Sequence, residues 1–319
     1  MQPHALLTFP PSFSVSPPEQ NNHTKTNPGP PQLPPPTTAD INAYISIFLP
    51  TTSTPAALRS FASNARKSSI RALVSANLTS RCHLSPSLAC LSTVPKTTCA
   101  PLNPYFSFWS YTCNTLAWCG PTPFPNLTPH KSHPILPILM HHFACAVPSH
   151  ESLTLLTRLA TGRTIVDIGS GTGYWTFMLR QYGATCVAID NGQSAWRTMW
   201  VDDTVPAEGT QWLGRHENRG GEDMLVLVVY PIVGGGLAGG TEGGFMRGLM
   251  RACNANTIAV VGTQNRNGYT AFRDMTVDEF MEKEHGNCWE KAVQVPLPSF
   301  AGKDEALFVF QKRECLFAP

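Results

Sequence analysis

The fold of this chain is decided by residues 165–175, which read Ile165-Val166-Asp167-Ile168-Gly169-Ser170-Gly171-Thr172-Gly173-Tyr174-Trp175. A short β-branched run carries an acidic residue, three glycines follow at alternate positions, and an apolar helical pattern comes next. A strand, glycine loop and helix in this order let the backbone approach a bound nucleoside and aim helix N–H groups at an anionic group. We therefore predict a nucleoside site at this loop, against the simpler alternative of a tight turn without a ligand.

A second acidic residue stands where such a site would need one. The β-branched run Thr185–Ile189 ends in Asp190, and a carboxylate at that strand end can accept both hydroxyl hydrogens of a ribose. The dinucleotide fingerprint G-x-G-x-x-G would require glycine at position 174, where this chain has Tyr174. The spacing therefore favours a mononucleoside-type cofactor over NAD.

A G-x-G-x-G loop preceded by Val166-Asp167-Ile168 resembles motif I of the class I S-adenosylmethionine (SAM)-dependent methyltransferases, and the resemblance extends over roughly residues 150–313. It implies SAM as cofactor, with Asp167 orienting the methionine ammonium directly or through water and Asp190 holding the ribose hydroxyls. The loop residues implied to pass beneath the methionine part and the ribose are Gly169, Ser170, Gly171 and Gly173.

The two halves of the chain differ in composition. Residues 1–150 hold 24 of the 29 prolines and eight basic but only two acidic side chains, whereas residues 151–319 hold fifteen basic and nineteen acidic ones. The formal net charge of +2 gives no general nucleic-acid footprint. A basic stretch over 59–81 could touch RNA, a membrane surface or an acidic partner, or simply be solvated.

These differences predict three parts. Residues 1–98 are expected to be low in complexity and largely disordered, with short helices starting near Thr38 or Asp40 and over 56–76 that have few partners nearby. Residues 99–149, with an aromatic cluster and an apolar run around His141 and His142, are expected to form a lid. Residues 150–319 are expected to form the SAM-binding, methyltransferase-like domain.

The cysteines and the apolar runs argue against a metal-binding, a secreted and a membrane-spanning protein. Ten cysteines form no C-x-x-C pair and no zinc-like quartet, so no metal is expected. The first residues do not show the pattern of a signal peptide, a basic segment followed by an uninterrupted apolar one. No apolar run reaches the roughly 18 residues that a membrane span needs. We predict an intracellular, cytoplasmic protein, with a nuclear or mitochondrial location left open.

Strands and helices alternate through the second half of the sequence. Strands are expected at 164–168, 185–189, 204–207, 224–230 and 257–261, with helices at 150–160, 174–182, 194–199 and 245–253. A capped helix at 276–285 then precedes two strands, 289–296 and 306–312, with no helix between them. The expected fold class is α/β: a doubly wound, mostly parallel seven-stranded sheet with an antiparallel last strand, as in class I methyltransferase-like Rossmann folds.

The carboxyl ends of these strands select the candidate site. Besides the glycine loop, they bring in Asp190 with Asn191, Glu208 and Tyr230. Glu208 is a candidate for the adenine amino group, although Asp202 or Asp203 could take this role, and a solvated turn carboxylate is an equal alternative.

Two residues are candidates for catalysis. Tyr230 follows the fourth strand but lacks the D/N-P-P-Y pattern of methyltransferases that act on amide-like or exocyclic nitrogens; its ring could favour a cationic centre or simply pack. His142 could supply a base from the lid or be a satisfied core histidine.

Taken together, these residues predict a SAM-dependent methyltransferase with an unidentified acceptor. The alternative is a catalytically inactive methyltransferase-like binding or scaffold protein, because no acceptor motif or obvious base is found. An NAD(P)-dependent oxidoreductase is disfavoured by Tyr174 and the closing strands.

Overall fold

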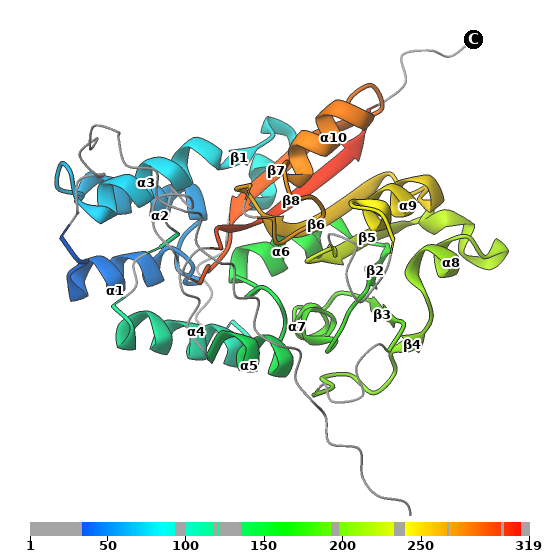
Figure 1. Cartoon of the computed structure of the whole chain (residues 1–319), viewed down its shortest axis with the longest axis horizontal. Helices are drawn as coiled ribbons and strands as arrows, with labels where there is room; N and C mark the ends of the chain where they lie inside the picture. Colours follow the sequence, from blue (N-terminus) through cyan, green and yellow to red (C-terminus); the bar gives the residue numbers. More distant parts are fainter. Residues whose placement is uncertain are drawn as a thin grey trace, which may run out of the picture. The chain divides into compact units, whose positions relative to one another are not determined.

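A mixed β-sheet organises the chain, as the computed structural model shows (Figure 1). The structure describes residues 34–92, 100–117, 120–121, 135–192, 198–232, 240–266, 268–300 and 303–313. Over these residues the sheet has eight strands in the order β1-β7-β8-β6-β5-β2-β3-β4. Their bounds are β1 His83–Leu84, β2 Thr164–Ile168, β3 Cys186–Asp190, β4 Val205–Pro206, β5 Met224–Val229, β6 Thr257–Thr263, β7 Trp289–Pro296 and β8 Glu305–Lys312.

The pairing confirms the expected fold class. Strands β4, β3, β2, β5 and β6 run parallel to one another, whereas β8 is antiparallel to both β6 and β7. The expected sheet had seven strands, and the eighth is β1, which pairs antiparallel with the outer edge of β7. β1 has only two residues, His83 and Leu84, and its pairing with β7 identifies it as a strand.

The helices cover both faces of this sheet. They are α1 Thr38–Ser46, α2 Thr54–Ser63, α3 Ile70–Arg81, α4 Pro104–Thr115, α5 Ile135–His142, α6 His150–Leu159, α7 Tyr174–Gln181, α8 Gly209–Leu213, α9 Gly244–Ala252 and α10 Val277–His285. The expected helix at 194–199 falls mostly outside the described residues.

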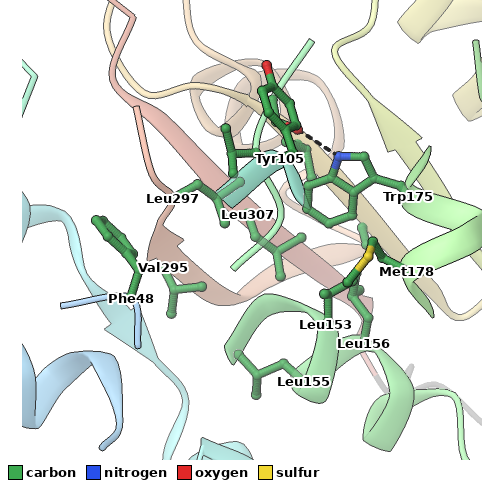
Figure 2. Close-up of a cluster of buried hydrophobic side chains, with 14 of the residues drawn as sticks. Phe48, Tyr105, Leu153, Leu155, Leu156, Trp175, Met178, Val295, Leu297 and Leu307 are labelled. Atoms are coloured by element: carbon green, nitrogen blue, oxygen red, sulfur yellow. Dashed lines mark hydrogen bonds between the residues drawn. The ribbon is translucent and has the colours of Figure 1, made fainter. Parts of the chain in front are cut away.

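Alternate residues of the central strands point to opposite faces of the sheet and pack into two separate hydrophobic cores. Leu225 and Leu227 of β5 face a core shared with α6 and α7, whereas Val226 and Val228 face a core shared with α8, α9 and α10. Figure 2 shows part of the first core, where Leu153 and Leu156 of α6 lie with Met178 of α7. A strand buried on both faces explains why β5 reads as an unbroken apolar run.

The helices α1, α2 and α3 differ from the disorder expected for residues 1–98. Tyr44 of α1 and Phe61 of α2 are almost wholly buried and belong to the same core as α6 and α7. The backbone N–H of Thr54 donates to Glu151 of α6 at 2.7 Å. Residues 34–92 are therefore part of the folded unit Leu33–Pro319. Short helices were expected in this region, but not that partners such as Trp109 of α4 bury their apolar side chains.

The segment expected to form a lid also belongs to this unit. Trp109 of α4 is completely buried and donates its indole N–H to the carbonyl of Ser299 at 3.1 Å. Tyr105 of α4 stacks on Phe143, which follows α5, with ring centroids 4.7 Å apart. Tyr105 and Trp109 of α4 are therefore core, whereas Phe108 and Tyr111 of the same helix are exposed. Helix α5 contributes to the cavity described below. Within the described ranges, no helix has the length and apolar character needed to cross a bilayer.

Candidate functional site

A cavity of about 800 Å³ opens at the carboxyl ends of β2, β3 and β5. This is the edge at which open α/β sheets bind ligands. One part of its wall comes from the loops after β2 and β3 and from the start of α8, and another from α5 and the segment after β5. The candidate residues on this wall are Gly169, Ser170, Gly171, Asp190, Asn191, Glu208 and Tyr230.

The glycine loop between β2 and α7 has a backbone that only glycine adopts easily. Gly169, Gly171 and Gly173 have φ angles of 72°, 59° and 73°, in the left-handed region that costs other residues energy. A Cβ on Gly173 would lie 2.5 Å from Val201 Cγ2. Ser170 contributes a hydroxyl that is buried and has no hydrogen-bond partner within the described residues. The loop is therefore tightly specified, and it presents a polar group that the protein leaves unused.

Asp167 lies inside the sheet and not on the cavity wall. Its side chain is completely buried; Oδ2 accepts a hydrogen bond from the Thr176 hydroxyl at 2.8 Å, and Oδ1 has no partner within the described residues. The pKa of Asp167 is raised to about 7, mainly by burial; the hydrogen bond from Thr176 opposes this rise and the nearby carboxylate of Asp190 adds to it. Asp167 therefore carries an unused acceptor oxygen that titrates near neutrality.

The raised pKa of Asp167 predicts how folding stability depends on pH. Because the native state holds this proton at pH values where the unfolded chain, with a pKa near 3.8, has lost it, the stability from this group is present below pH 4 and lost as pH rises towards 7. Replacing Asp167 by Asn should remove this loss and raise the free energy of unfolding at pH 8, relative to wild type, by up to about 4 kcal/mol. Urea unfolding at pH 4.5 and pH 8 measures the effect.

A second buried carboxyl, that of Glu305, also makes the free energy of unfolding fall as pH rises, since burial raises its pKa to about 7 as well. The Asp167→Asn variant should therefore keep the part of the pH dependence that Glu305 contributes. The exposed Asp202 supplies the control, and Asp202→Asn should follow wild type. Because burial lowers the pKa of His150 and His285, which acts in the opposite direction over this range, the comparison between variants is decisive. An Asp167→Asn variant whose stability relative to wild type is the same at pH 4.5 and pH 8 would contradict this account of Asp167.

Asp190, at the end of β3, is hydrogen-bonded to the backbone of the glycine loop that follows β2. Its Oδ2 accepts from the Gly171 N–H and its Oδ1 from the Gly192 N–H, both at 2.8 Å. Each carboxylate oxygen can accept more than one hydrogen bond. Asn191 follows as an exposed residue on the same wall.

Glu208 has a structural task in the described fold. It is the N-cap of α8, and its Oε2 accepts from the backbone N–H groups of Thr210 at 2.9 Å and Gln211 at 3.1 Å. It lines the cavity as well. The other candidates for this role, Asp202 and Asp203, do not line it, and Asp203 pairs with Arg180 at 2.8 Å.

Tyr230 lines the cavity and is also held by the fold. Its backbone N–H donates to Val261 at 2.7 Å, and its φ of 61° turns the chain at the end of β5. Its hydroxyl accepts a hydrogen bond from the ammonium of Lys303 at 2.9 Å. Burial raises the pKa of Tyr230 well above its usual value, so the phenol stays protonated. Packing and cavity lining, which the sequence left as alternatives, therefore coexist.

His142 is placed differently from the expected base. It does not line the cavity, and its Nδ1 lies 3.2 Å from the Thr198 hydroxyl. Its neighbour His141 does line the cavity. Adjacent residues of α5 point in different directions, because the helix turns by about 100° per residue, and the sequence could not tell which of the two faces the site.

Lys303 is the site residue that the sequence did not reveal. It precedes β8, and because β8 runs antiparallel, its first residue, Glu305, pairs with Thr263 at the end of β6. Lys303 is only 4% exposed, and its ammonium lies 4.4 Å above the Tyr230 ring and 3.8 Å from Glu305 Oε1. The rule that selects strand ends omits this position, since it lies at the beginning of its strand.

Comparisons with known proteins give only fold-level similarity. No protein-family model matches the chain, and no curated protein matches it. Among solved structures, a 1,6-didemethyltoxoflavin-N1-methyltransferase from Burkholderia thailandensis, with S-adenosylhomocysteine (SAH) bound, is 12% identical over 52% of this chain and 78% of its own, with a TM-score of 0.36. A SAM-dependent methyltransferase from Agrobacterium tumefaciens is 11% identical over 50% of this chain and 60% of its own, with a TM-score of 0.34.

Two further structures described as methyltransferases, one with SAH bound and one from Streptococcus mutans, match 48% of this chain. Their identities are 11% and 14%, with TM-scores of 0.34 and 0.33, and the match spans less than half of their length, 46% and 45%. Similarities of this size carry no assignment of activity, so the function is argued from the site.

Proposed function

We propose that this protein is a SAM-dependent methyltransferase. The observation that carries the proposal is the single cavity in which the glycine loop of β2, the terminal acid of β3 and the aromatic residue after β5 meet. A nucleoside with a short charged tail needs these groups: a loop that the ligand can approach closely, a carboxylate for ribose hydroxyls, and space beyond them for an acceptor.

The residues present fit SAM. The free Ser170 hydroxyl and the free Asp167 Oδ1 are buried polar atoms without partners in the described chain, and such atoms are costly unless a ligand or water satisfies them. Asp190 would hold the ribose, and the glycine loop would lie under the methionine part. Asp167 lies off the cavity wall, so it would favour the methionine ammonium through water. SAM would supply a methyl group on a sulfonium, which is already a good leaving group.

The chain's own contribution would then be positioning and exclusion of water. Transfer by in-line displacement depends mostly on holding the reacting atoms in line. Tyr230 is held rigidly by its backbone bond to Val261 and its hydroxyl bond to Lys303. Leu136 and Met140 of α5 line the same cavity and would exclude water from it.

The structure also bears on the oxidoreductase alternative. Tyr174, which stands where a dinucleotide loop needs glycine, is completely buried, and its hydroxyl donates to Asn103 at 2.7 Å and accepts from the Tyr105 N–H at 3.0 Å. This position is thus committed to packing against α4. The inactive-scaffold alternative keeps one observation in its favour, the use of Glu208 and Asp190 in capping and loop contacts.

Calorimetric titration of the full chain tests the proposal. We expect SAM and SAH to bind with dissociation constants in the micromolar range, about −8 kcal/mol, and NAD and NADP not to bind. Binding of SAH together with methyl transfer to no acceptor in a broad screen would favour the scaffold alternative. Absence of SAM and SAH binding would refute both.

A further inference from the structure

Lys303 gives the cavity a buried positive charge at a distance from the glycine loop. Its Nζ lies 2.9 Å from the Tyr230 hydroxyl, 3.6 Å from Met140 Sδ and 3.8 Å from Glu305 Oε1. An ammonium has three hydrogens to donate. Of these three atoms only the Tyr230 oxygen is a good acceptor within hydrogen-bonding distance, so the ammonium keeps donor capacity towards the cavity that it lines.

The surroundings of Lys303 compensate its charge only in part. The rings of Tyr230 and Tyr269 lie 4.4 and 5.6 Å from Nζ and offer cation–π attraction. Among the residues that the structure describes, Glu305 is the carboxylate that pairs with the Lys303 ammonium. It is itself buried, and burial raises its pKa to about 7, so near neutral pH it is only partly ionised. A buried ammonium with a partial counter-charge is costly unless another anion completes it.

The position of Lys303 separates it from the part of the cavity suited to the nucleoside. In the sheet order, β6 and β5 lie between β8 and β2. Lys303 lines the cavity beside Tyr230 at the end of β5 and Tyr269, which its ammonium contacts, whereas Asp190 and Glu208 line it at the end of β3 and before α8. The cation therefore lies beside the space left for the acceptor.

We propose that Lys303 is the anchor for an anionic oxygen of the methyl acceptor, so that the acceptor is a small organic acid whose carboxylate or ionised hydroxyl hydrogen-bonds the Lys303 ammonium. This inference rests on the proposed function and names its substrate class. A charge-assisted bond of this kind is stronger than a neutral one, and the apolar side chains of Leu136, Ile232 and Phe245 on the same wall suit an apolar body. An anion here also offsets the second positive charge, the sulfonium of SAM.

The experiment compares benzoate with benzamide, which has the same shape without the charge, by calorimetry on the full-length protein saturated with SAH. We expect benzoate to bind at least about tenfold more tightly than benzamide, because only benzoate gives Lys303 a charged acceptor. The Lys303→Met variant should lose this difference and Lys303→Arg should keep most of it. Lys312→Met, which removes an exposed lysine at the far end of β8, should behave as wild type.

Two results would overturn the proposal. The first is equal binding of benzoate and benzamide to the wild-type protein. The second is a Lys303→Met variant that loses affinity for SAH while keeping it for 5′-methylthioadenosine, which lacks the amino-acid carboxylate; Lys303 would then hold the methionine tail of the cofactor. Failure of the proposed function is a separate observation, since SAH would then not bind to the wild-type protein at all. Circular dichroism of each variant verifies that it is folded.

Discussion

A chain shortened to begin at Ala100 is expected to lose cooperative folding. Such a chain lacks α1, α2, α3 and β1. The buried side chains that it loses include Tyr44 of α1, Phe48 of the following turn and Phe61 of α2. Loss of one buried aromatic side chain costs roughly 3–5 kcal/mol, and a whole domain is stable by only about 5–15 kcal/mol. Removing all three therefore exceeds the stability available. Urea unfolding followed by near-ultraviolet circular dichroism and tryptophan fluorescence measures the loss.

A chain beginning at Leu33, the first residue of the folded unit, is the matched control and should unfold at the same urea concentration as the full chain. A single substitution gives an intermediate case. Tyr44 contacts Trp109 with ring centroids 5.6 Å apart, and Tyr44→Ala should lower the free energy of unfolding by roughly 3–5 kcal/mol. A stable, cooperative fragment starting at Ala100 would mean that α1–α3 are an accessory of a self-sufficient core.

The second large effect is expected at Asp190. Replacing it by Ala removes the acceptor of the Gly171 and Gly192 N–H groups, which loosens the glycine loop, and also removes the acceptor proposed for the ribose hydroxyls. Hydrogen bonds to a charged group contribute about 1.5–3 kcal/mol, so the dissociation constant of SAH should rise by roughly 10- to 150-fold. Calorimetric titration with SAH measures the change.

Asp203 provides the control for Asp190. It lies beyond β3 as well, but it is an exposed residue that pairs with Arg180 and does not line the cavity. Asp203→Ala should leave the affinity for SAH unchanged within about twofold, since surface ion pairs contribute little. An Asp190→Ala variant that binds SAH as tightly as wild type would show that the ribose is held elsewhere.

The second half of the chain could be predicted closely because its patterns are local. β7 was expected at 289–296 and is found at Trp289–Pro296, and α6 was expected at 150–160 and is found at His150–Leu159. Thr276 precedes α10, and its N–H donates to Glu279 at 2.8 Å as the capping pattern predicts. Apolar periodicity, caps and glycines act within a few residues, so they can be recognised without the tertiary structure.

The first half could not be predicted in this way, for a physical reason. A helix such as α1 is short and marginal by itself, and its stability comes from burying Tyr44 and Ile47 against side chains from later in the chain. The same holds for β1, whose His83 pairs with Gln294. The composition of this region is proline-rich and polar, and composition does not show which distant residues its few apolar side chains contact.

For the candidate site, the sequence by itself predicted the glycine loop and Asp190, which line the cavity, because each position follows from a strand end and from backbone angles that few residues adopt. Asp167 was predicted with them, but it lies off the cavity wall. Only the tertiary structure decided that His141 and not His142 lines the cavity, that Glu208 caps α8, and that Lys303 reaches Tyr230. Lys303 and Tyr230 are far apart in sequence and meet because β8 runs antiparallel, which places its beginning at the edge where the parallel strands end. Contacts of this kind depend on the direction and order of strands, which no local pattern around Lys303 encodes.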